Sequence, residues 1–194
     1  PAPSAVADAL STSENATTTG NVLTNDSDPD GDTLLVSQVN GIVGNVGSNV
    51  TGSDGGTFTI LANGSYAFNP GTSFDNLAVG ETRTTSITYT ISDSEGGSSS
   101  ATLSITVTGT NDGPVSSAIS NQIFLDGEVV NLDIANNFSD PDGSDTLIFG
   151  STNLPPGLTL NPATGVISGT INPGASASGP YSVTVTATDS HGQV

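Results

Sequence analysis

Acidic residues recur in one short motif that appears twice in the sequence. Ser-Asp-Pro-Asp-Gly occupies residues 27–31 and again residues 139–143. Each copy is followed further along the chain by Asp-Ser-x-Gly, at residues 93–96 and 189–192. Two carboxylates one residue apart, held in a turn by proline and glycine, form an oxygen-rich corner that a hard cation such as Ca²⁺ can occupy. The repeated order predicts two calcium-binding modules.

Two other interpretations of the motif have to be weighed. Asp26, Asp28 and Asp30 begin like the loop of an EF-hand, but Ser37 stands at the twelfth position, where a bidentate glutamate is expected. A single Asp-Pro-Asp-Gly is also an ordinary β-turn. Recurrence with the same second acidic corner favours the metal, because a divalent ion relieves the repulsion between carboxylates that a fold brings together.

Composition excludes several classes of function. The chain has 194 residues, of which 19 are acidic and one is basic, and its formal charge is −18, so nucleic acid and anionic membrane surfaces would be repelled. There is no run of about 18 apolar residues for a membrane span. Without cysteine there are no disulfides or thiolate metal sites. The one histidine, His191, is interpreted as a solvated turn residue, which argues against a catalytic triad and against an enzyme.

Alternating apolar and hydroxyl-bearing residues predict half-buried antiparallel strands and no helix. The fold class is therefore all-β, with two tandem immunoglobulin-like or cadherin-like β-sandwiches. The expected strands are residues 34–39, 58–60, 66–68, 86–92, 103–108, 129–134, 158–160, 166–168 and 181–187. The expected core of the first module is Leu34, Val36, Phe58, Ile60, Tyr66, Phe68, Ile87, Tyr89, Ile91, Leu103, Ile105 and Val107. In the second module it is Leu132, Ile134, Phe138, Leu147, Leu158, Val166, Val183 and Val185.

A boundary is predicted at residues 110–114, where Gly113 permits a turn and Pro114 stops strand pairing. The predicted domains are residues 1–112 and 113–194. The first module has a strand after its Asp-Ser-x-Gly corner, whereas the second does not reach one within the sequence. We expect the second sandwich to lack its last strand, either by truncation or because that strand comes from a downstream segment or another chain.

Longer stretches of both modules resemble known families. The first module resembles VCBS or bacterial cadherin-like repeats, and the second is similar to a dystroglycan-type cadherin-like domain of the immunoglobulin kind. The stretches that carry the resemblance are residues 13–15, 20–32, 64–68 and 107–112 in the first module, and residues 154–158 and 164–170 in the second.

This resemblance implies tandem extracellular modules of large bacterial adhesins of the RTX type, exported to the cell surface by type I secretion. In such arrays Ca²⁺ lies between adjacent modules. The ligands implied at the boundary are Glu14, Asn111, Asp112, Asp140, Asp142 and Asp189. Asp28, Asp30 and Asp93 would form the equivalent half-site toward a preceding module. The mid-domain Asp-x-Glu of cadherins has no match, so fewer ions are expected than at a cadherin boundary.

The leading hypothesis is a calcium-stabilised spacer that rigidifies tandem modules for cell adhesion, with the adjacent modules of the same long chain as partners. The alternative is a binding module for a polysaccharide, a host-cell ligand or a partner strand at the cell surface.

Overall fold

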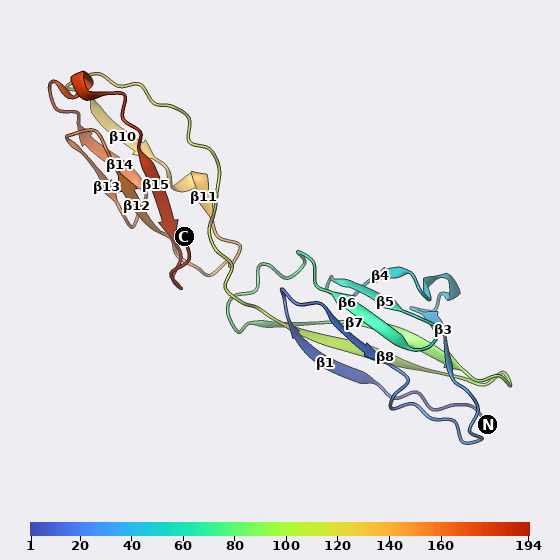
Figure 1. Ribbon diagram of the computed structural model, residues 1–194. Helices are drawn as coiled ribbons and strands as arrows, with labels where there is room; N and C mark the ends of the chain where they lie inside the picture. The colour runs from blue at the N-terminus through green and yellow to red at the C-terminus, as the bar shows by residue number, and fades with distance from the viewer. The chain divides into compact units, whose positions relative to one another are not determined.

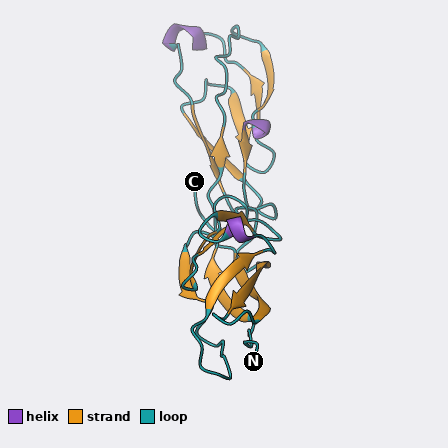
Figure 2. Cartoon of the chain, turned by 90° about the vertical axis from the view of Figure 1, so that its right-hand side faces the viewer, coloured by secondary structure: helices purple, strands orange, loops and turns teal.

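The computed structural model describes residues 1–194, which divide into two compact units, Pro1–Thr110 (unit 1) and Asn111–Val194 (unit 2). Strands and loops make up almost all of both units (Figure 2). The helical segments are three short 3₁₀ turns, η1 (Val43–Asn45), η2 (Ala135–Asn137) and η3 (Ala175–Ser178). No helix has the length and apolar character that a membrane crossing requires. The all-β prediction with two sandwich-like units is confirmed.

Unit 1 contains two four-stranded sheets (Figure 1). The first has the order β1-β8-β7-β3 and the second the order β2-β6-β5-β4. β1 runs parallel to β8, and the remaining neighbours are antiparallel. The bounds are β1 (Asp8–Ser13), β2 (Thr18–Asn21), β3 (Leu35–Val39), β4 (Asn49–Thr51), β5 (Thr57–Ile60), β6 (Ser65–Asn69), β7 (Thr82–Ser92) and β8 (Ser98–Thr108).

The core of unit 1 follows from the period-two pattern of its long strands. β7 and β8 pair along eleven residues each and turn one aliphatic or aromatic face inward. Phe58 and Phe68 pack against that face from the second sheet, with ring centroids 4.6 Å apart. Eleven of the twelve residues expected in this core are buried, and Leu34 is half-buried at its margin. The sequence pattern did not single out Val22, Val39, Phe74 and Leu77, which are buried as well.

The turn between β5 and β6 spans residues 61–64, and Gly64 is its residue with a positive φ. Its φ angle is +82°, and the backbone amides of Leu61 and Gly64 close the turn. Asn63 does not adopt the positive φ that an Asn-Gly pair has in a type I′ turn. Instead, the Asn63 side chain accepts a hydrogen bond from the Ser65 amide at 3.1 Å.

Tyr89 ties the first residues of unit 1 to the sandwich. Its hydroxyl is 2.8 Å from Asp8 Oδ2 and 2.9 Å from the Val6 carbonyl oxygen, and the Asp26 carboxylate lies 3.5 Å away. Burial, together with the charge of Asp26, raises the pKa of Asp8, although the hydrogen bond from Tyr89 acts in the opposite direction. The ionised form of Asp8 is therefore disfavoured in the folded state.

Unit 2 is built from smaller sheets, with the orders β10-β14-β13, β11-β9 and β12-β15. All of these pairs are antiparallel. The bounds are β9 (Val115–Ser116), β10 (Val129–Asp133), β11 (Phe138–Ser139), β12 (Ile148–Thr152), β13 (Leu158–Asn161), β14 (Val166–Thr170) and β15 (Thr184–Thr188).

The core of unit 2 is thinner than expected. Of the predicted residues only Ile134 is fully buried, and Val166 is partly buried next to the more deeply buried Ile167. Ile167 is the inward residue of β14, at 5% exposure, because it pairs with Leu132 on one side and Leu160 on the other. The remaining predicted residues, Leu132, Phe138, Leu147, Leu158, Val183 and Val185, are only partly buried.

We predict that Asp8→Asn stabilises unit 1 at neutral pH. Because the folded state raises the pKa of Asp8, its ionised form costs stability above that pKa, and the wild-type protein regains this stability as the pH falls. The variant should unfold with a free energy higher by about 0.5 kcal/mol at pH 7, reduced by solvent screening at this half-buried site. The gain should disappear at a pH below the pKa of unfolded aspartate.

Thermal unfolding in a chelating buffer at several pH values measures this difference. Asp54→Asn removes the same charge from an exposed turn and serves as the control. An Asp8→Asn gain that persists unchanged in acid would contradict the assignment to the Asp8 carboxylate.

Candidate metal centre

The second Asp-Pro-Asp-Gly motif of the chain forms a tight turn at one end of unit 2. Asp140 Oδ1 accepts a hydrogen bond from the Asp142 amide at 2.9 Å, and the Asp142 carbonyl oxygen accepts one from the Asp145 amide at 2.9 Å. This is the side-chain-to-backbone bonding for which aspartate is favoured in turns. The turn leaves Asp142 only 1% exposed and directs its carboxylate inward.

The hairpin that follows β15 supplies a second carboxylate. Asp189 Oδ1 accepts hydrogen bonds from the amides of His191 and Gln193, both at 2.8 Å, and its backbone amide donates to the Gln193 carbonyl oxygen at 3.0 Å. The carboxylate is thereby fixed by the turn that it closes. Asp189 is 4% exposed.

The first residues of unit 2 connect these two turns. Asn111 Nδ2 donates to Asp189 Oδ2 at 2.8 Å, and the amide of Asp112 donates to Asp142 Oδ2 at 3.0 Å. We call this group the unit 2 corner. It consists of Asn111, Asp112, Asp140, Asp142, Asp145, Asp189 and His191.

Several oxygen atoms of the unit 2 corner are buried and accept no hydrogen bond. They are Oδ1 of Asn111, Oδ2 of Asp140 and Oδ1 of Asp142. A buried carboxylate oxygen without a donor is costly, and such atoms call for a bound ion or water. Amide and carboxylate oxygens are also the donor set that Ca²⁺ prefers. The residues present therefore fit a hard cation.

Asp145 is central to the electrostatics of the corner. Its carboxylate belongs to two close groups, one with Asp140 and Asp142 and one with Asp189 and His191, and within each group the ligand atoms lie within 4.8 Å of one another. Burial, with the charges of Asp142, Asp145 and Asp189, raises the pKa of Asp140. The crowding of negative charge is thus a strain that a cation would relieve.

Asp189 and His191 respond differently to the same surroundings. Burial acts to raise the pKa of Asp189, but the hydrogen bonds from Asn111 and three backbone amides outweigh it and lower the pKa overall. His191 Nδ1 lies 3.0 Å from Asp145 Oδ2, and this contact raises the pKa of His191. The histidine is therefore paired with a carboxylate rather than simply solvated, although its side chain is 44% exposed.

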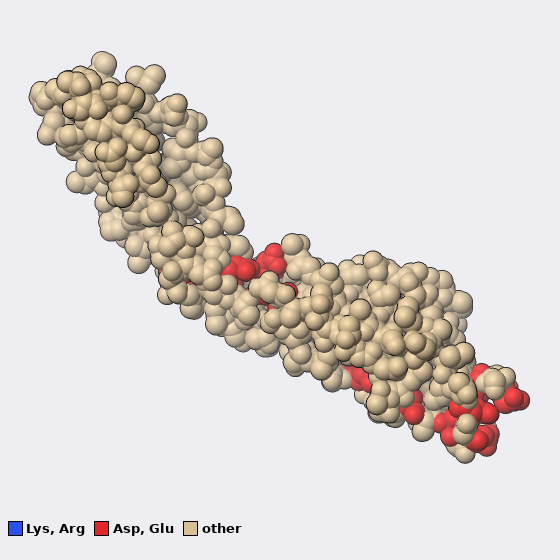
Figure 3. Space-filling view, in the orientation of Figure 1, with Lys and Arg blue, Asp and Glu red and all other residues tan.

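The first motif builds a related turn in unit 1. Asp28 Oδ1 accepts hydrogen bonds from the amides of Asp30 at 2.7 Å and Asp32 at 3.4 Å, while Oδ2 of Asp28 is buried without a donor. The three carboxylates form a close group. The N-terminal amine of Pro1 pairs with Asp30. Figure 3 shows acidic atoms gathered at the end of unit 1 that carries the N-terminus.

Asp93 is not part of that close group. Its Oδ1 accepts hydrogen bonds from the amides of Glu95 and Gly97 at 2.9 and 2.7 Å, which closes the hairpin between β7 and β8. The turn is the same as the one made by Asp189 in unit 2.

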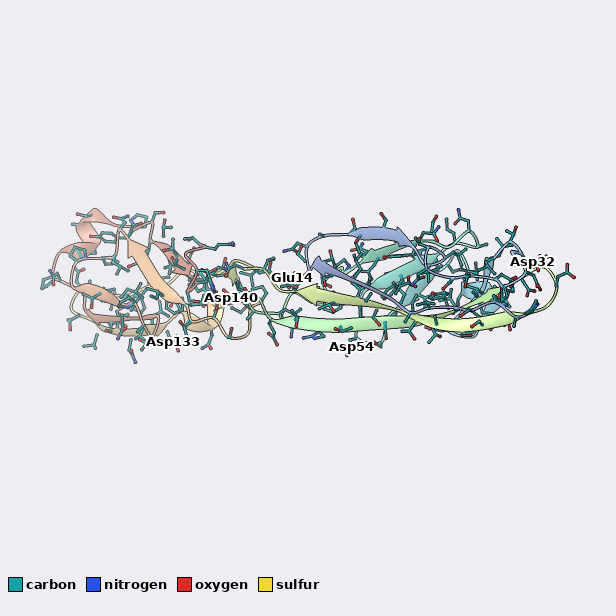
Figure 4. All side chains as sticks on the ribbon, turned by 90° about the horizontal axis from the view of Figure 1, so that it is seen from below. Glu14, Asp32, Asp54, Asp133 and Asp140 are labelled. Carbon is teal, nitrogen blue, oxygen red and sulfur yellow. The ribbon has the colours of Figure 1, made fainter.

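Glu14 lies at the end of unit 1 opposite Asp32 (Figure 4). It is only 1% exposed, and its Oε1 accepts hydrogen bonds from both the amide and the hydroxyl of Thr110. The last residue of unit 1 is thereby fixed to the residue that follows β1.

The motif analysis missed Asp32 and Asp145. Both could have been found, because each copy of Asp-Pro-Asp-Gly is followed within two residues by a further aspartate. The structure thus brings together Asn111, Asp112, Asp140, Asp142 and Asp189 in unit 2 and Asp28 with Asp30 in unit 1.

Comparison with known proteins supports the two-unit description. The family model described as "Bacterial cadherin-like domain" matches residues 1–109, and the one described as "Putative Ig domain" matches residues 113–194. No curated protein matches the sequence.

Solved cadherin ectodomains share the fold at low sequence identity. Drosophila N-cadherin EC1-4 is 14% identical, with a TM-score of 0.51 over 96% of this chain and 45% of that chain. Mouse cadherin-23 EC22-24 is 17% identical, with a TM-score of 0.56 over 100% and 62%. Human CDH23 EC21-23 is 14% identical, with a TM-score of 0.54 over 97% and 68%. The chain thus spans about half the length of the first two structures. On the family match over residues 1–109, the chain belongs to the bacterial cadherin-like domain family, and its second unit is an Ig-like domain.

Proposed function

We propose that this chain is a calcium-stabilised extracellular spacer of a bacterial surface adhesin, in which bound Ca²⁺ stiffens the connection between adjacent modules. The observation that carries the proposal is the set of buried oxygens without hydrogen-bond donors at the unit 2 corner, Asn111 Oδ1, Asp140 Oδ2 and Asp142 Oδ1. The family match to bacterial cadherin-like domains is consistent with it.

The proposed ligands come mainly from unit 2. Asp140, Asp142 and Asp189 supply carboxylate oxygens and Asn111 supplies its amide oxygen, with Asp145 as a neighbouring acceptor. Asp112 and, from unit 1, Glu14 complete the proposed set. Ca²⁺ takes six to eight oxygen ligands and tolerates irregular geometry, which suits a site assembled from turns.

Calcium binding would convert repulsion into stability. The crowded carboxylates that raise the pKa of Asp140 become ligands of a divalent cation. Extracellular modules bind Ca²⁺ with dissociation constants of about 10⁻⁴ to 10⁻³ M, so a weak site is useful outside the cell. At a free concentration about 100-fold above the dissociation constant, the ion adds about 2.7 kcal/mol to the free energy of unfolding.

The proposed stiffening role is supported by where the connecting residues are anchored. Thr110 is hydrogen-bonded to Glu14 within unit 1, and the next residue, Asn111, is hydrogen-bonded to Asp189 within unit 2. Few backbone torsions therefore remain free between the two anchors. An ion bound by Asn111 and the unit 2 carboxylates would hold the second anchor in place.

The acidic group of unit 1, Asp28, Asp30 and Asp32, would bind Ca²⁺ at a boundary with a module that precedes unit 1. Asp28 and Asp30, with Asp32, offer the same kind of turn, and Asp28 Oδ2 is buried without a donor. Asp93, proposed from the sequence for this half-site, would act mainly by closing the neighbouring hairpin.

We predict that Asp140→Asn has opposite effects with and without calcium. In a chelating buffer the variant should unfold at a higher temperature than the wild type, because it removes a carboxylate whose ionised form the fold disfavours. In millimolar Ca²⁺ it should unfold at a lower temperature, because a ligand oxygen is lost. Isothermal titration calorimetry should show a calcium affinity weakened by about tenfold or more, or about 1.4 kcal/mol.

Asp133→Asn is the matched control for this experiment. Asp133 is in the same unit, carries the same charge and accepts a hydrogen bond from the Ala135 amide at 2.9 Å, which an asparagine can keep. Asp133 and Asp140 are both labelled in Figure 4. A stabilising effect of Asp140→Asn in both buffers would show that the corner binds no calcium.

We also predict that calcium narrows the distribution of distances between the two units. The chain has no cysteine, so spin labels can be attached at Ala67→Cys in unit 1 and Ala163→Cys in unit 2, both exposed positions. Double electron–electron resonance should give one narrow distance distribution in millimolar Ca²⁺ and a broad one in chelator.

Glu14→Gln in the labelled protein separates stiffening from folding. A glutamine can still accept the hydrogen bonds from Thr110, but it lacks the charge of a calcium ligand. The variant should stay folded and lose part of the calcium-dependent narrowing. If the labelled protein that keeps Glu14 gives distance distributions of equal width in calcium and in chelator, the spacer mechanism is ruled out. That result would not contradict calcium binding itself.

A further inference from the structure

The unit 2 corner contains the only imidazole of the chain. His191 is the single histidine, and the sequence has no cysteine. Its Nδ1 atom lies 3.0 Å from Asp145 Oδ2, and the ligand atoms of Asp145, Asp189 and His191 are all within 4.8 Å of one another. The ligands proposed for calcium are oxygen atoms, so the calcium site gives this nitrogen no role.

The ligand atoms of the corner fall into two sets with different chemistry. One close group consists of the carboxylates of Asp140, Asp142 and Asp145, and the other contains Asp145, Asp189 and His191. Ca²⁺ takes oxygen ligands, whereas an imidazole suits Zn²⁺ and related transition-metal ions. The two sets therefore indicate two ion positions of different preference that have Asp145 in common.

The spacing of the mixed set suits a bound transition-metal ion. Zn²⁺ binds histidine nitrogen and carboxylate oxygen at about 2.0 to 2.2 Å, so two such ligands at right angles lie about 3 Å apart. His191 Nδ1 and Asp145 Oδ2 have this separation. Asp189 Oδ2 accepts one hydrogen bond, from Asn111 Nδ2, and a carboxylate oxygen has a second lone pair for a metal ion.

The fold holds the three side chains in place before any ion binds. Ile148 pairs with Thr188 at the end of the β12–β15 ladder, so Asp145 and Asp189 belong to the two segments that extend it. The Asp145 amide donates to the Asp142 carbonyl oxygen, and the His191 amide donates to Asp189 Oδ1. The Asp145 side chain is 5% exposed and the His191 side chain 44%, so the imidazole remains accessible from solvent.

Asp142 gives independent evidence for a cation beside Asp145. Asp142 is 1% exposed, and its Oδ1 atom is buried without a hydrogen-bond donor. It belongs to the same close group as Asp145, the residue that both sets contain. A buried carboxylate oxygen with no donor is costly unless an ion or water binds it. A merely crowded acidic surface would leave its oxygens in solvent.

We propose that Asp145, Asp189 and His191 form a second metal position in the unit 2 corner, which takes a divalent transition-metal ion such as Zn²⁺. The inference builds on the proposed calcium site, with which this position shares Asp145. The ion would join the turn before β12 to the hairpin after β15 and so hold one end of a two-stranded sheet together. Three protein ligands leave the fourth position of a tetrahedral zinc ion to water.

Isothermal titration of the full chain with Zn²⁺, in a buffer that contains millimolar Ca²⁺, tests the proposal. The wild type should bind Zn²⁺ while calcium is present. His191→Gln should weaken zinc binding by about tenfold or more, or about 1.4 kcal/mol, and leave the calcium affinity unchanged. The glutamine keeps the backbone amide that donates to Asp189 Oδ1. Asp133→Asn is the matched control and should change neither affinity.

Nuclear magnetic resonance of the imidazole gives a second measurement that needs no variant. Because the chain has one histidine, its ring signals belong to His191 alone. Zn²⁺ should shift these signals in the presence of millimolar Ca²⁺, and the same concentration of Mg²⁺ should not. Unchanged ring signals, or equal zinc affinities for the wild type and His191→Gln, would overturn the proposal. Zinc binding that disappears in saturating Ca²⁺ would overturn the second position in favour of a single shared one.

The same titrations separate this proposal from the calcium site. Asp140→Asn should weaken the binding of calcium much more than that of zinc, whereas Asp145→Asn should weaken both, because Asp145 belongs to both sets. A wild-type chain that binds Zn²⁺ through His191 but binds no Ca²⁺ would refute the calcium proposal alone.

Discussion

Negative charge that the chain cannot neutralise by itself is the constraint on which this structure depends. The chain has 19 acidic residues, and its only basic side chain, Arg83, donates to the neutral oxygens of Ser73 and Asn76. The carboxylates are therefore accommodated in other ways. Many accept backbone amides in tight turns, as Asp28, Asp140 and Asp189 do. In Asp28 and Asp140 this satisfies one carboxylate oxygen and leaves the other buried without a donor, and these second oxygens are the atoms that a cation would bind.

The two units differ in how much hydrophobic burial is available to offset this negative charge. Unit 1 closes its core with the long β7–β8 hairpin and an aromatic pair, Phe58 and Phe68, so its corner can carry excess charge at one end of a well-packed sandwich. Unit 2 has small sheets, and its core opens into a cleft. A given change in free energy at the unit 2 corner is therefore a larger fraction of the total stability of unit 2 than the same change would be in unit 1, because a small domain with a thin core is only marginally stable.

The regular parts of unit 1 were predictable from the sequence because alternation in β7 and β8 is long and unambiguous. β14 was harder, since Val166 and Ile167 are adjacent aliphatic residues and only the pairing with Leu132 and Leu160 decides which one faces inward. At the site, the motif identified Asp140 and Asp142 as neighbours. The motif could not show that Asp93 Oδ1 accepts hydrogen bonds from the amides of its own hairpin. Those hydrogen bonds depend on the three-dimensional structure of the turn.

The unit 2 corner couples the connecting residues to the stability of the unit. Asn111 and Asp112 donate to Asp189 and Asp142, so the same hydrogen bonds that fix the connection also hold the carboxylates in place. If Ca²⁺ binds these carboxylates, linkage is reciprocal: whatever pulls Asn111 away weakens calcium binding, and calcium opposes the pull by the same free energy. The stiffness of the connection and the stability of unit 2 would then both depend on the calcium concentration outside the cell.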